Sequence, residues 1–450
     1  MEEAVSCRLK LLFFMIKNSL NGIEESILLT EKFKQKLKLC FHECFSKDEA
    51  LLLCWGSMAR KEMGPFSDLD LILILSRKTN NRKVKKFHDC LSRKLINRID
   101  LLEAYDLKTL SKIGSIDGTD RQAILLARPV CGNSKLKKDF LILQNIFHNQ
   151  VHENMREILH TWSSLFSVSK NIYINKSNNL KFSLGFLRHV IFILLIVKLF
   201  FDKKNVVWST QKAITILGKL GEVNNDTQTA FLTSLNFILE FRNKVQFFMK
   251  NESYYIDNNL LNGMAKKSNC SVDFLKSRLE DNRSNIVLSS KDINKVISRL
   301  ICKKSTAEFQ KYENLLNILI DFEKEINFET EEIIMDTKQE ILLVLLAHRS
   351  KNPRILETLR KNNMTNWYIV YGIAINLYSS PQTLLKLVKP ENKAGSYIYK
   401  LYDSFAWRNI RLYVAKNKIA DKKVLNYIFN HKNSRQMDKE AALYTLTSKR

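Results

Sequence analysis

Glycine and proline are scarce in this chain, which has 12 glycines and 5 prolines among its 450 residues. An all-β fold needs many tight turns, and these two residues supply most of the backbone conformations that such turns require. Their scarcity argues against an all-β fold. It predicts a chain in which helices dominate, with enough length for two or three domains.

Long apolar runs are also missing. The most apolar stretch, Val190 to Phe201, contains Lys198 and is shorter than the roughly 20 residues that a membrane-spanning helix needs. We expect it to be a buried helix. At the N-terminus, Met1-Glu2-Glu3 is acidic, and the apolar run from Leu11 to Ile16 is too short for a signal peptide. We therefore expect no membrane partner.

The eight cysteines include no Cys-x-x-Cys pair. A chain of this size does not need disulfides to hold its core together. We expect reduced thiols and a cytoplasmic protein.

Acidic residues are outnumbered, with 46 Asp and Glu against 72 Lys and Arg, for a net charge of +26. Such a charge attracts nucleic acid, acidic proteins or membranes. Lysines dominate over arginines and are spread along the whole chain, so a general compositional bias explains the charge slightly better. Clustering of Lys and Arg around the site would instead favour an RNA partner.

The apolar pattern changes from helical to strand-like along the chain. Residues 1–49 show helical spacing and predict two helices, followed by buried strands over Ala50–Trp55 and Leu69–Leu75. A helix is expected over Arg82–Leu95 and a third strand over Ile96–Ala104. The rest of the chain is almost purely helical in pattern. The predicted class is α+β, a small mixed β-sheet with flanking helices followed by a helical region.

A short pattern recurs near the C-terminus. An apolar helix end, a polar break and a second apolar helix occur around Asn352-Pro353, Ser380-Pro381 and Ala420-Asp421, and a fourth copy begins at Ala441. Units of this kind bury their cores only by stacking on their neighbours. The segment resembles leucine-rich-variant or HEAT-like helical repeats, which implies a solenoid with a surface for a protein partner.

Two short motifs lie on the first two predicted strands. Gly56-Ser57 ends the first strand, where the chain turns into a short helix, and Asp68-x-Asp70 opens the second. Without a Cβ at Gly56, backbone N–H groups can approach a phosphate closely, and the helix N-terminus favours an anion. Ser57 can donate its hydroxyl to a phosphate oxygen. Arg60 is expected on the first helical turn, facing the same way.

The two aspartates are expected side by side, because residues i and i+2 of a strand share a face. Parallel carboxylates beside a phosphate cradle suit Mg²⁺, which prefers oxygen ligands, and such a pair supports two-metal displacement at phosphorus. Each dipeptide also occurs in ordinary solvated turns. The order of the motifs and their apolar surroundings favour the catalytic interpretation, because an unpaired carboxylate among apolar residues is costly.

The stretch from Gly56 to Leu71 resembles the nucleotidyltransferase motif of the DNA polymerase beta superfamily, and more closely that of the bacterial protein-PII uridylyltransferases. Those enzymes carry Gly-Gly-x-Gly-Arg-x-Glu-Leu-x-Pro-Tyr-Ser-Asp-Ile-Asp-Leu. The matching residues here are Arg60, Glu62, Pro65, Ser67, Asp68 and Asp70, with Phe66 in place of the family's tyrosine. Three later segments resemble further motifs of the family in the family's order, namely Asp120–Gly132, Asn179–His189 and Phe237–Lys244.

The resemblance implies a Mg²⁺ or Mn²⁺ cofactor and a set of site residues. The implied catalytic and metal-binding carboxylates are Asp68, Asp70 and a third on a later strand, for which Asp100 is the candidate and Glu103 the fallback. The implied nucleotide-binding residues are Gly56, Ser57, Arg60, Lys181 and Arg188. Phe186 replaces a glycine of the family and His189 an aspartate, so this segment either contacts the nucleotide or only packs.

The full-length uridylyltransferases continue into an HD hydrolase domain and ACT sensor domains. After residue 189 this chain has only His348 and His431 and no His-Asp dipeptide, so we expect neither the hydrolase nor the nitrogen-sensing role. We expect a nucleotidyltransferase domain with N-terminal helices over residues 1–135, a helical domain over 136–335 and helical repeats over 336–450.

The expected reaction moves a nucleoside monophosphate, UMP or AMP, from a nucleoside triphosphate to an acceptor and releases pyrophosphate. We expect a protein acceptor rather than RNA. One alternative is a decayed nucleotidyltransferase fold that acts as a scaffold, binding a protein partner through its repeats. The net charge keeps an RNA-modifying transferase or toxin as another.

Three histidines, His148, His152 and His160, recur near Glu153 and Glu157 on what reads as one helix. One face of it could bind zinc. The glutamates do not stand as in His-Glu-x-x-His, and no fourth ligand is apparent, so an ordinary solvated helix is the favoured interpretation.

Overall fold

The computed structural model divides the chain into two compact units, each built from two segments. Unit 1 comprises Met1–Ile158 and Lys176–Ile297, and unit 2 comprises Leu159–Asn175 and Ser298–Arg450. The structure describes residues 21–76, 81–95, 99–116, 118–172, 179–181, 185–201, 209–251, 254–304, 312–321, 324–389, 410–431 and 434–448. The predicted first helix lies outside the described residues.

The elements of unit 1 are α2 (Gly22–Cys44), β1 (Ala50–Cys54), α3 (Gly56–Ala59), β2 (Leu69–Leu75), α4 (Asn81–Lys94), β3 (Ile99–Tyr105), α5 (Leu107–Ile116), α6 (Gly118–Leu126), β4 (Arg128–Gly132), α7 (Ser134–Asn149), α9 (Leu187–Phe201), α10 (Thr210–Lys219), α11 (Asn225–Met249) and α12 (Asn258–Ser268). Unit 2 contains α15 (Glu313–Ile320), α16 (Phe328–Thr337), α17 (Glu340–Arg349), α18 (Pro353–Asn362), α19 (Trp367–Ile375), α20 (Pro381–Val388), α23 (Ile410–Lys416), α24 (Lys422–Asn430) and α25 (Gln436–Ser448). Two helices, α8 (Val151–Ile172) and α13 (Val272–Lys304), contribute to both units.

The sheet of unit 1 has the strand order β3-β2-β1-β4. Strands β2 and β3 are parallel, and β1 pairs antiparallel with both β2 and β4. The predicted α+β class with a small mixed sheet is confirmed. The sequence pattern missed β4, because a five-residue edge strand with Pro129 inside it and Gly132 at its end shows no apolar alternation. The third strand was predicted to begin at Ile96, and it is described from Ile99.

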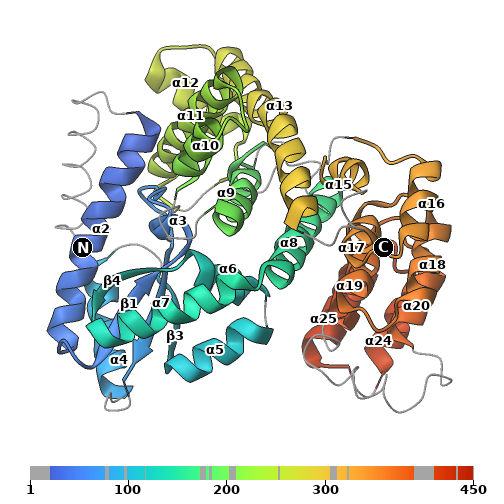
Figure 1. Cartoon of the computed structure of the whole chain (residues 1–450), viewed down its shortest axis with the longest axis horizontal. Helices are drawn as coiled ribbons and strands as arrows, with labels where there is room; N and C mark the ends of the chain where they lie inside the picture. Colours follow the sequence, from blue (N-terminus) through green and yellow to red (C-terminus); the bar gives the residue numbers. More distant parts are fainter. Residues whose placement is uncertain are drawn as a thin grey trace. The chain divides into compact units, whose positions relative to one another are not determined.

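Helices cover both faces of the sheet (Figure 1). Alternate strand residues such as Leu52 and Leu71 join a buried cluster with α2 and α4. The other set, which includes Leu53 and Ile72, packs with residues of α5, α6 and α7. Because strand residues alternate between faces, the near-continuous apolar runs of β1 and β2 are what a sheet buried on both sides requires.

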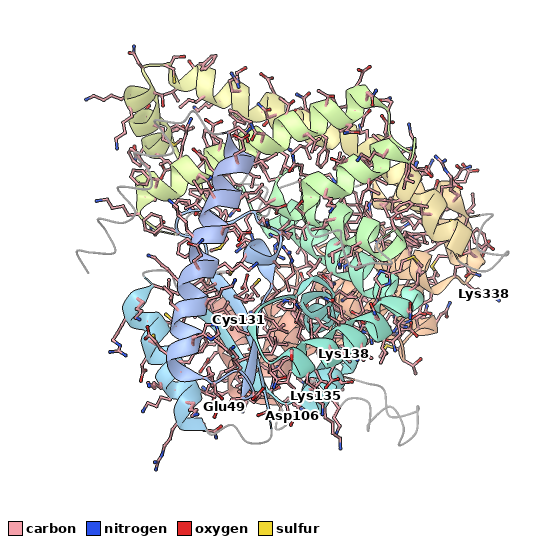
Figure 2. The ribbon with its side chains drawn as sticks, turned by 60° about the vertical axis from the view of Figure 1, so that its left-hand side comes forward. Glu49, Asp106, Cys131, Lys135, Lys138 and Lys338 are labelled. Carbon is pink, nitrogen blue, oxygen red and sulfur yellow. The ribbon has the colours of Figure 1, made fainter. Side chains whose placement is uncertain are left out.

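Two acidic residues mark the end of the sheet where β1 begins and β3 ends. Glu49 precedes β1 and Asp106 follows β3, as Figure 2 shows. Glu49 forms an ion pair with Lys83, and Asp106 accepts hydrogen bonds from the backbone N–H and hydroxyl of Thr109 at the start of α5. Both carboxylates are held by local structural contacts, and these hydrogen bonds lower the pKa of each. The Gly56 turn lies at the opposite end of the sheet.

The stretch that carries the three clustered histidines is two helices rather than one. Helix α7 ends at Asn149 and α8 begins at Val151. The break is stabilised by Asn154, whose side-chain amide donates to the carbonyl oxygen of Phe147 at 2.5 Å. His148 contacts the carbonyl oxygen of Lys198 instead. The expectation of a single helical face with His148 and His152 four residues apart is therefore wrong, and the side chain of His152 lies outside the described residues.

The most apolar helix, α9, is buried along almost its whole length, as its sequence predicts. Even Lys198 is buried, with 5% of the residue exposed. Within the described ranges, no helix combines the length and the hydropathy needed to cross a membrane.

Unit 2 consists of helices stacked in two rows. Helices α17, α19, α23 and α25 pack one on the next, and α18, α20 and α24 form the second row beside them. Each helix of the second row begins after a capping side chain. Asn352, Ser380 and Asp421 each accept a hydrogen bond from a backbone N–H in the first turn. These caps are the polar breaks of the sequence pattern.

Two buried asparagines tie successive layers of the first row together. The side-chain amide of Asn376 donates to the carbonyl oxygens of Ala347 and Ser350, at 3.0 Å each. One layer on, the amide of Asn417 donates to the carbonyl oxygens of Ala374 and Asn376, at 2.9 and 3.0 Å. Each side chain satisfies carbonyl groups that a helix end leaves without intrahelical partners. The same device recurs from layer to layer, while the specific resemblance to leucine-rich-variant or HEAT-like repeats stays a prediction.

Candidate active site

The turn between β1 and α3 places backbone and carboxylate in direct contact. The β1–β2 ladder continues past Cys54, because the N–H of Trp55 donates to the carbonyl oxygen of Asp70 at 2.9 Å. The chain then turns at Gly56, whose φ of +59° lies in the left-handed region that favours glycine. A single helical turn, α3, follows.

Gly56 lies against the carboxylate of Asp70. A Cβ added at Gly56 would stand 1.8 Å from Oδ2 of Asp70, so the carboxylate or the turn would have to shift. The position therefore favours glycine for two reasons, its backbone angle and the space that the carboxylate fills. Gly56 and Ser57 are both half-buried, so the turn is accessible to solvent from one side.

The two aspartates of the motif occupy neighbouring positions at the start of β2. Asp70 is the second residue of the strand, and Asp68 stands just before it. Both are half-buried. Residues i and i+2 of an extended chain share a face, so Asp68 and Asp70 lie on the side of the sheet to which Ile72 and Ile74 also belong.

The candidate third carboxylate is placed by the backbone only. Asp100 of β3 is paired with Asp70 in the parallel register, and residues paired in this way are neighbours on adjacent strands. Glu103 lies beyond the register shift that follows Leu71. The side chains of both Asp100 and Glu103 lie outside the described residues, and the described side chains alone contain no group of three metal-binding residues.

Arg188 belongs to the same site. Burial lowers the pKa of its guanidinium, the positive charge of Arg60 lowers it further, and the negative charge of Asp70 acts in the opposite direction. Arg188 therefore lies within electrostatic reach of both the motif arginine and the motif carboxylate. It comes from the start of α9, so the helical part of unit 1 supplies a cation to the sheet.

Lys181 is tied to Arg188 but lies differently. The backbone N–H of Arg188 donates to the carbonyl oxygen of Lys181 at 3.0 Å. The ammonium of Lys181 lies over the ring of Tyr254, 4.8 Å from its centroid. The structure thus brings Arg188 to the charged groups of the motif and places the head group of Lys181 over Tyr254.

The two residues that depart from the family pattern are both buried. Phe186 is fully buried, and His189 has 3% of its surface exposed. The N–H of Gly185 donates to Nδ1 of His189 at 3.2 Å. Burial lowers the pKa of His189 to about 4. A neutral histidine accepting a hydrogen bond from the turn packs the segment together, where an aspartate would stand in the family.

The buried His189 predicts a pH dependence of stability. Its folded pKa of about 4 lies below the unfolded value of about 6.5, so the unfolded chain takes up the proton first as the pH falls. Stability is then lost between pH 6.5 and 4. We expect the free energy of unfolding to fall about 2 kcal/mol more in the wild type than in His189→Asn between pH 7 and 4.5, measured by urea denaturation. An equal fall in both proteins would refute this assignment.

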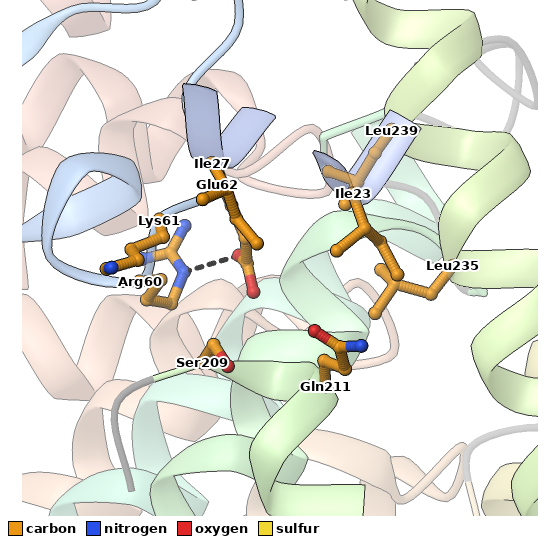
Figure 3. Close-up of a pocket in the computed structure, with 9 residues that line it drawn as sticks. All are labelled: Ile23, Ile27, Arg60, Lys61, Glu62, Ser209, Gln211, Leu235 and Leu239. Carbon is orange, nitrogen blue, oxygen red and sulfur yellow. Dashed lines mark hydrogen bonds and ion pairs between the residues drawn. The ribbon is translucent and has the colours of Figure 1, made fainter. Parts of the chain in front are cut away.

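Arg60 does not sit on the first turn of a helix, as the sequence suggested, because α3 is only one turn long and Arg60 is its C-cap. Its Nε donates to Oε2 of Glu62 at 2.8 Å, and both side chains are largely buried. The ion pair forms one wall of a small hollow of about 30 Å³, partly open to solvent, between α2, α10 and α11. Figure 3 shows the apolar side chains that line the rest of the hollow, Ile23, Ile27, Leu235 and Leu239.

The loop from Arg60 to Ser67 is docked on α11 at two points. Nη1 of Arg242 donates to the carbonyl oxygen of Glu62 at 2.6 Å, and Oε1 of Gln246 accepts from the N–H of Phe66 at 3.2 Å. The family-like segment Phe237–Lys244 includes Arg242 but predicts no role for it, and it ends before Gln246. The one available signal was the spacing of four residues, which puts both on one helical face.

Part of the chain matches a known family in sequence. Residues 34–121 match the sequence model of the nucleotidyltransferase domain. The match begins within α2, ends within α6 and includes Gly56, Ser57, Asp68, Asp70 and Asp100. No curated protein matches the chain. Residues 34–121 thus form a nucleotidyltransferase domain.

Proposed function

We propose that this protein transfers a nucleoside monophosphate, UMP or AMP, from a nucleoside triphosphate to an acceptor and releases pyrophosphate. The observation that carries the proposal is the contact between Gly56 and the Asp70 carboxylate. It joins a phosphate-binding turn to a pair of carboxylates, the two parts that phosphoryl transfer needs. The intact Gly56-Ser57 and Asp68-x-Asp70 motifs argue against a decayed scaffold.

The donor set of the proposed site suits Mg²⁺ or Mn²⁺. Asp68, Asp70 and Asp100 would hold the metal, since carboxylate oxygens are the ligands that such hard cations prefer. When bound, the metal would neutralise phosphate charge and activate the attacking oxygen of the acceptor. Arg60 and Arg188 would bind and orient the triphosphate, and the N–H groups of the Gly56 turn would donate to its oxygens.

The acceptor is proposed to be a protein. One basic side chain next to the motif, Lys61, is already paired with a glutamate, Glu31. This pairing reduces the positive charge available to an RNA backbone beside the turn. The stacked helices of unit 2 are proposed as a binding surface for a protein partner, and the uridylyltransferase likeness supports UTP as the first nucleotide to test.

Metal removal tests the proposal directly. Incubation of the protein and host lysate with α-³²P-labelled UTP or ATP and Mg²⁺ should label an acceptor, and EDTA should abolish the labelling. Protease or ribonuclease treatment of the product then separates a protein acceptor from RNA. Labelling that persists in EDTA would contradict the metal requirement. A failure to bind or transfer any of the four nucleoside triphosphates would contradict the proposed function.

A further inference from the structure

We infer that Glu62 and Arg242 are positioning residues that hold the Arg60 guanidinium toward the triphosphate. This inference rests on the proposed function. It adds a second layer of residues behind the motif, contributed partly by the helical part of unit 1, which sets the direction of an arginine that would otherwise be free to swing away from the nucleotide.

Glu62 is held through its side chain and its backbone. Its Oε2 accepts from Nε of Arg60 at 2.8 Å, and its Oε1 accepts from the N–H of Thr210 at 3.2 Å. Its own N–H donates to the carbonyl oxygen of Ser57 at 2.9 Å. With 7% of the residue exposed, Glu62 has little solvent to replace any of these contacts. Its carboxylate therefore presents one rigid acceptor to Arg60.

Arg242 fixes Glu62 from behind. It is almost fully buried, with 2% exposed, and burial lowers the pKa of its guanidinium. Beyond its bond to the carbonyl oxygen of Glu62, its Nη2 donates to Oγ of Ser26 at 3.1 Å and to Oδ1 of Asn243 at 2.8 Å. A buried cation with this set of contacts joins α11, α2 and the loop into one rigid piece.

The charge arrangement explains why Arg60 needs such support. Arg60 and Arg188 lie close enough for the charge of one to disfavour the charge of the other. Two neighbouring guanidiniums repel each other until an anion binds between them. The Glu62 carboxylate offsets that repulsion and accepts from Nε, which leaves the terminal amino groups of Arg60 available for phosphate oxygens.

Binding of Mg²⁺-UTP and of inorganic triphosphate, measured by titration calorimetry, tests the inference. Glu62→Gln keeps the shape of the side chain but removes its charge, so both ligands should bind about tenfold more weakly, as expected for loss of a charge-assisted contact. The same loss for both ligands would locate the effect at the phosphates. In an Arg60→Ala background, adding Glu62→Gln should alter affinity by less than about twofold.

A second pair of variants tests the same contact without removing the buried charge of Glu62. Thr210 is the first residue of α10, where proline is well tolerated, and Ser209 before it is extended, as a residue before proline must be. Thr210→Pro removes the backbone N–H that donates a hydrogen bond to Glu62. Thr210→Ala keeps this N–H and removes only the side-chain hydroxyl and methyl group. We expect weaker binding in Thr210→Pro than in Thr210→Ala at similar melting temperatures.

The outcomes separate the inference from the function on which it rests. If the wild type binds no nucleotide, the proposed function fails and the inference fails with it. If the wild type binds and transfers nucleotide but Glu62→Gln binds UTP normally, or weakens binding equally with and without Arg60, the inference alone is overturned.

Discussion

Replacing Asp70 by asparagine should reduce nucleotide transfer at least about a thousandfold while the protein stays folded. Asparagine has the shape of aspartate, so the contact with Gly56 is kept. What is lost is one of two negative charges at the start of β2 that the reaction needs to hold its cation. Loss of about 4 kcal/mol of transition-state stabilisation corresponds to this factor.

The measurement is initial-rate transfer of labelled nucleotide, with circular dichroism to confirm the fold. Asp106→Asn is the matched control, because Asp106 lies at the other end of the sheet and caps α5, and asparagine caps helices equally well. It should leave transfer unchanged. Transfer by Asp70→Asn at the wild-type rate would rule out the proposed site.

Gly56→Ala should have the second largest effect, a loss of transfer of about a hundredfold or more. The added Cβ would overlap Oδ2 of Asp70, and the carboxylate must move away from Asp68 or the turn must open. A displacement of about 1 Å at a reacting centre is enough for a loss of this size. The left-handed backbone angle adds a stability cost of about 1 kcal/mol.

Gly221→Ala separates the two causes. Gly221 also has a positive φ, +70°, but a Cβ there would meet no atom within 4 Å. It should therefore show a small drop in melting temperature, no larger than that of Gly56→Ala, with no loss of transfer. Equal transfer rates in the two variants would mean that the contact between Gly56 and Asp70 has no role in the reaction.

The sequence could predict the site where its parts lie close along the chain. Gly56 ends one predicted strand and Asp70 lies on the next, so the turn and the shared face of Asp68 and Asp70 follow from local pattern. The third carboxylate is harder, because the pairing of Asp70 with Asp100 depends on a parallel register that spacing does not determine.

Contacts across long stretches of sequence could not be predicted. Arg242 reaches Glu62 over 180 residues, and Arg188 reaches the motif from the start of α9. Both depend on how the helices of unit 1 pack on the sheet, which no periodicity encodes. The break between α7 and α8 was missed for a different reason, since it arises from one side chain, Asn154, bonding to a backbone carbonyl.

The division of each unit into two segments has a consequence for synthesis on the ribosome. Leu159–Asn175 emerges early, but the rest of its unit begins only at Ser298. This segment therefore stays without its packing partners from unit 2 until the remainder of unit 1 has been synthesised. Translation speed across residues 176–297 would then set how long it is exposed to chaperones. For the same reason, no single cut in the gene separates one unit from the other.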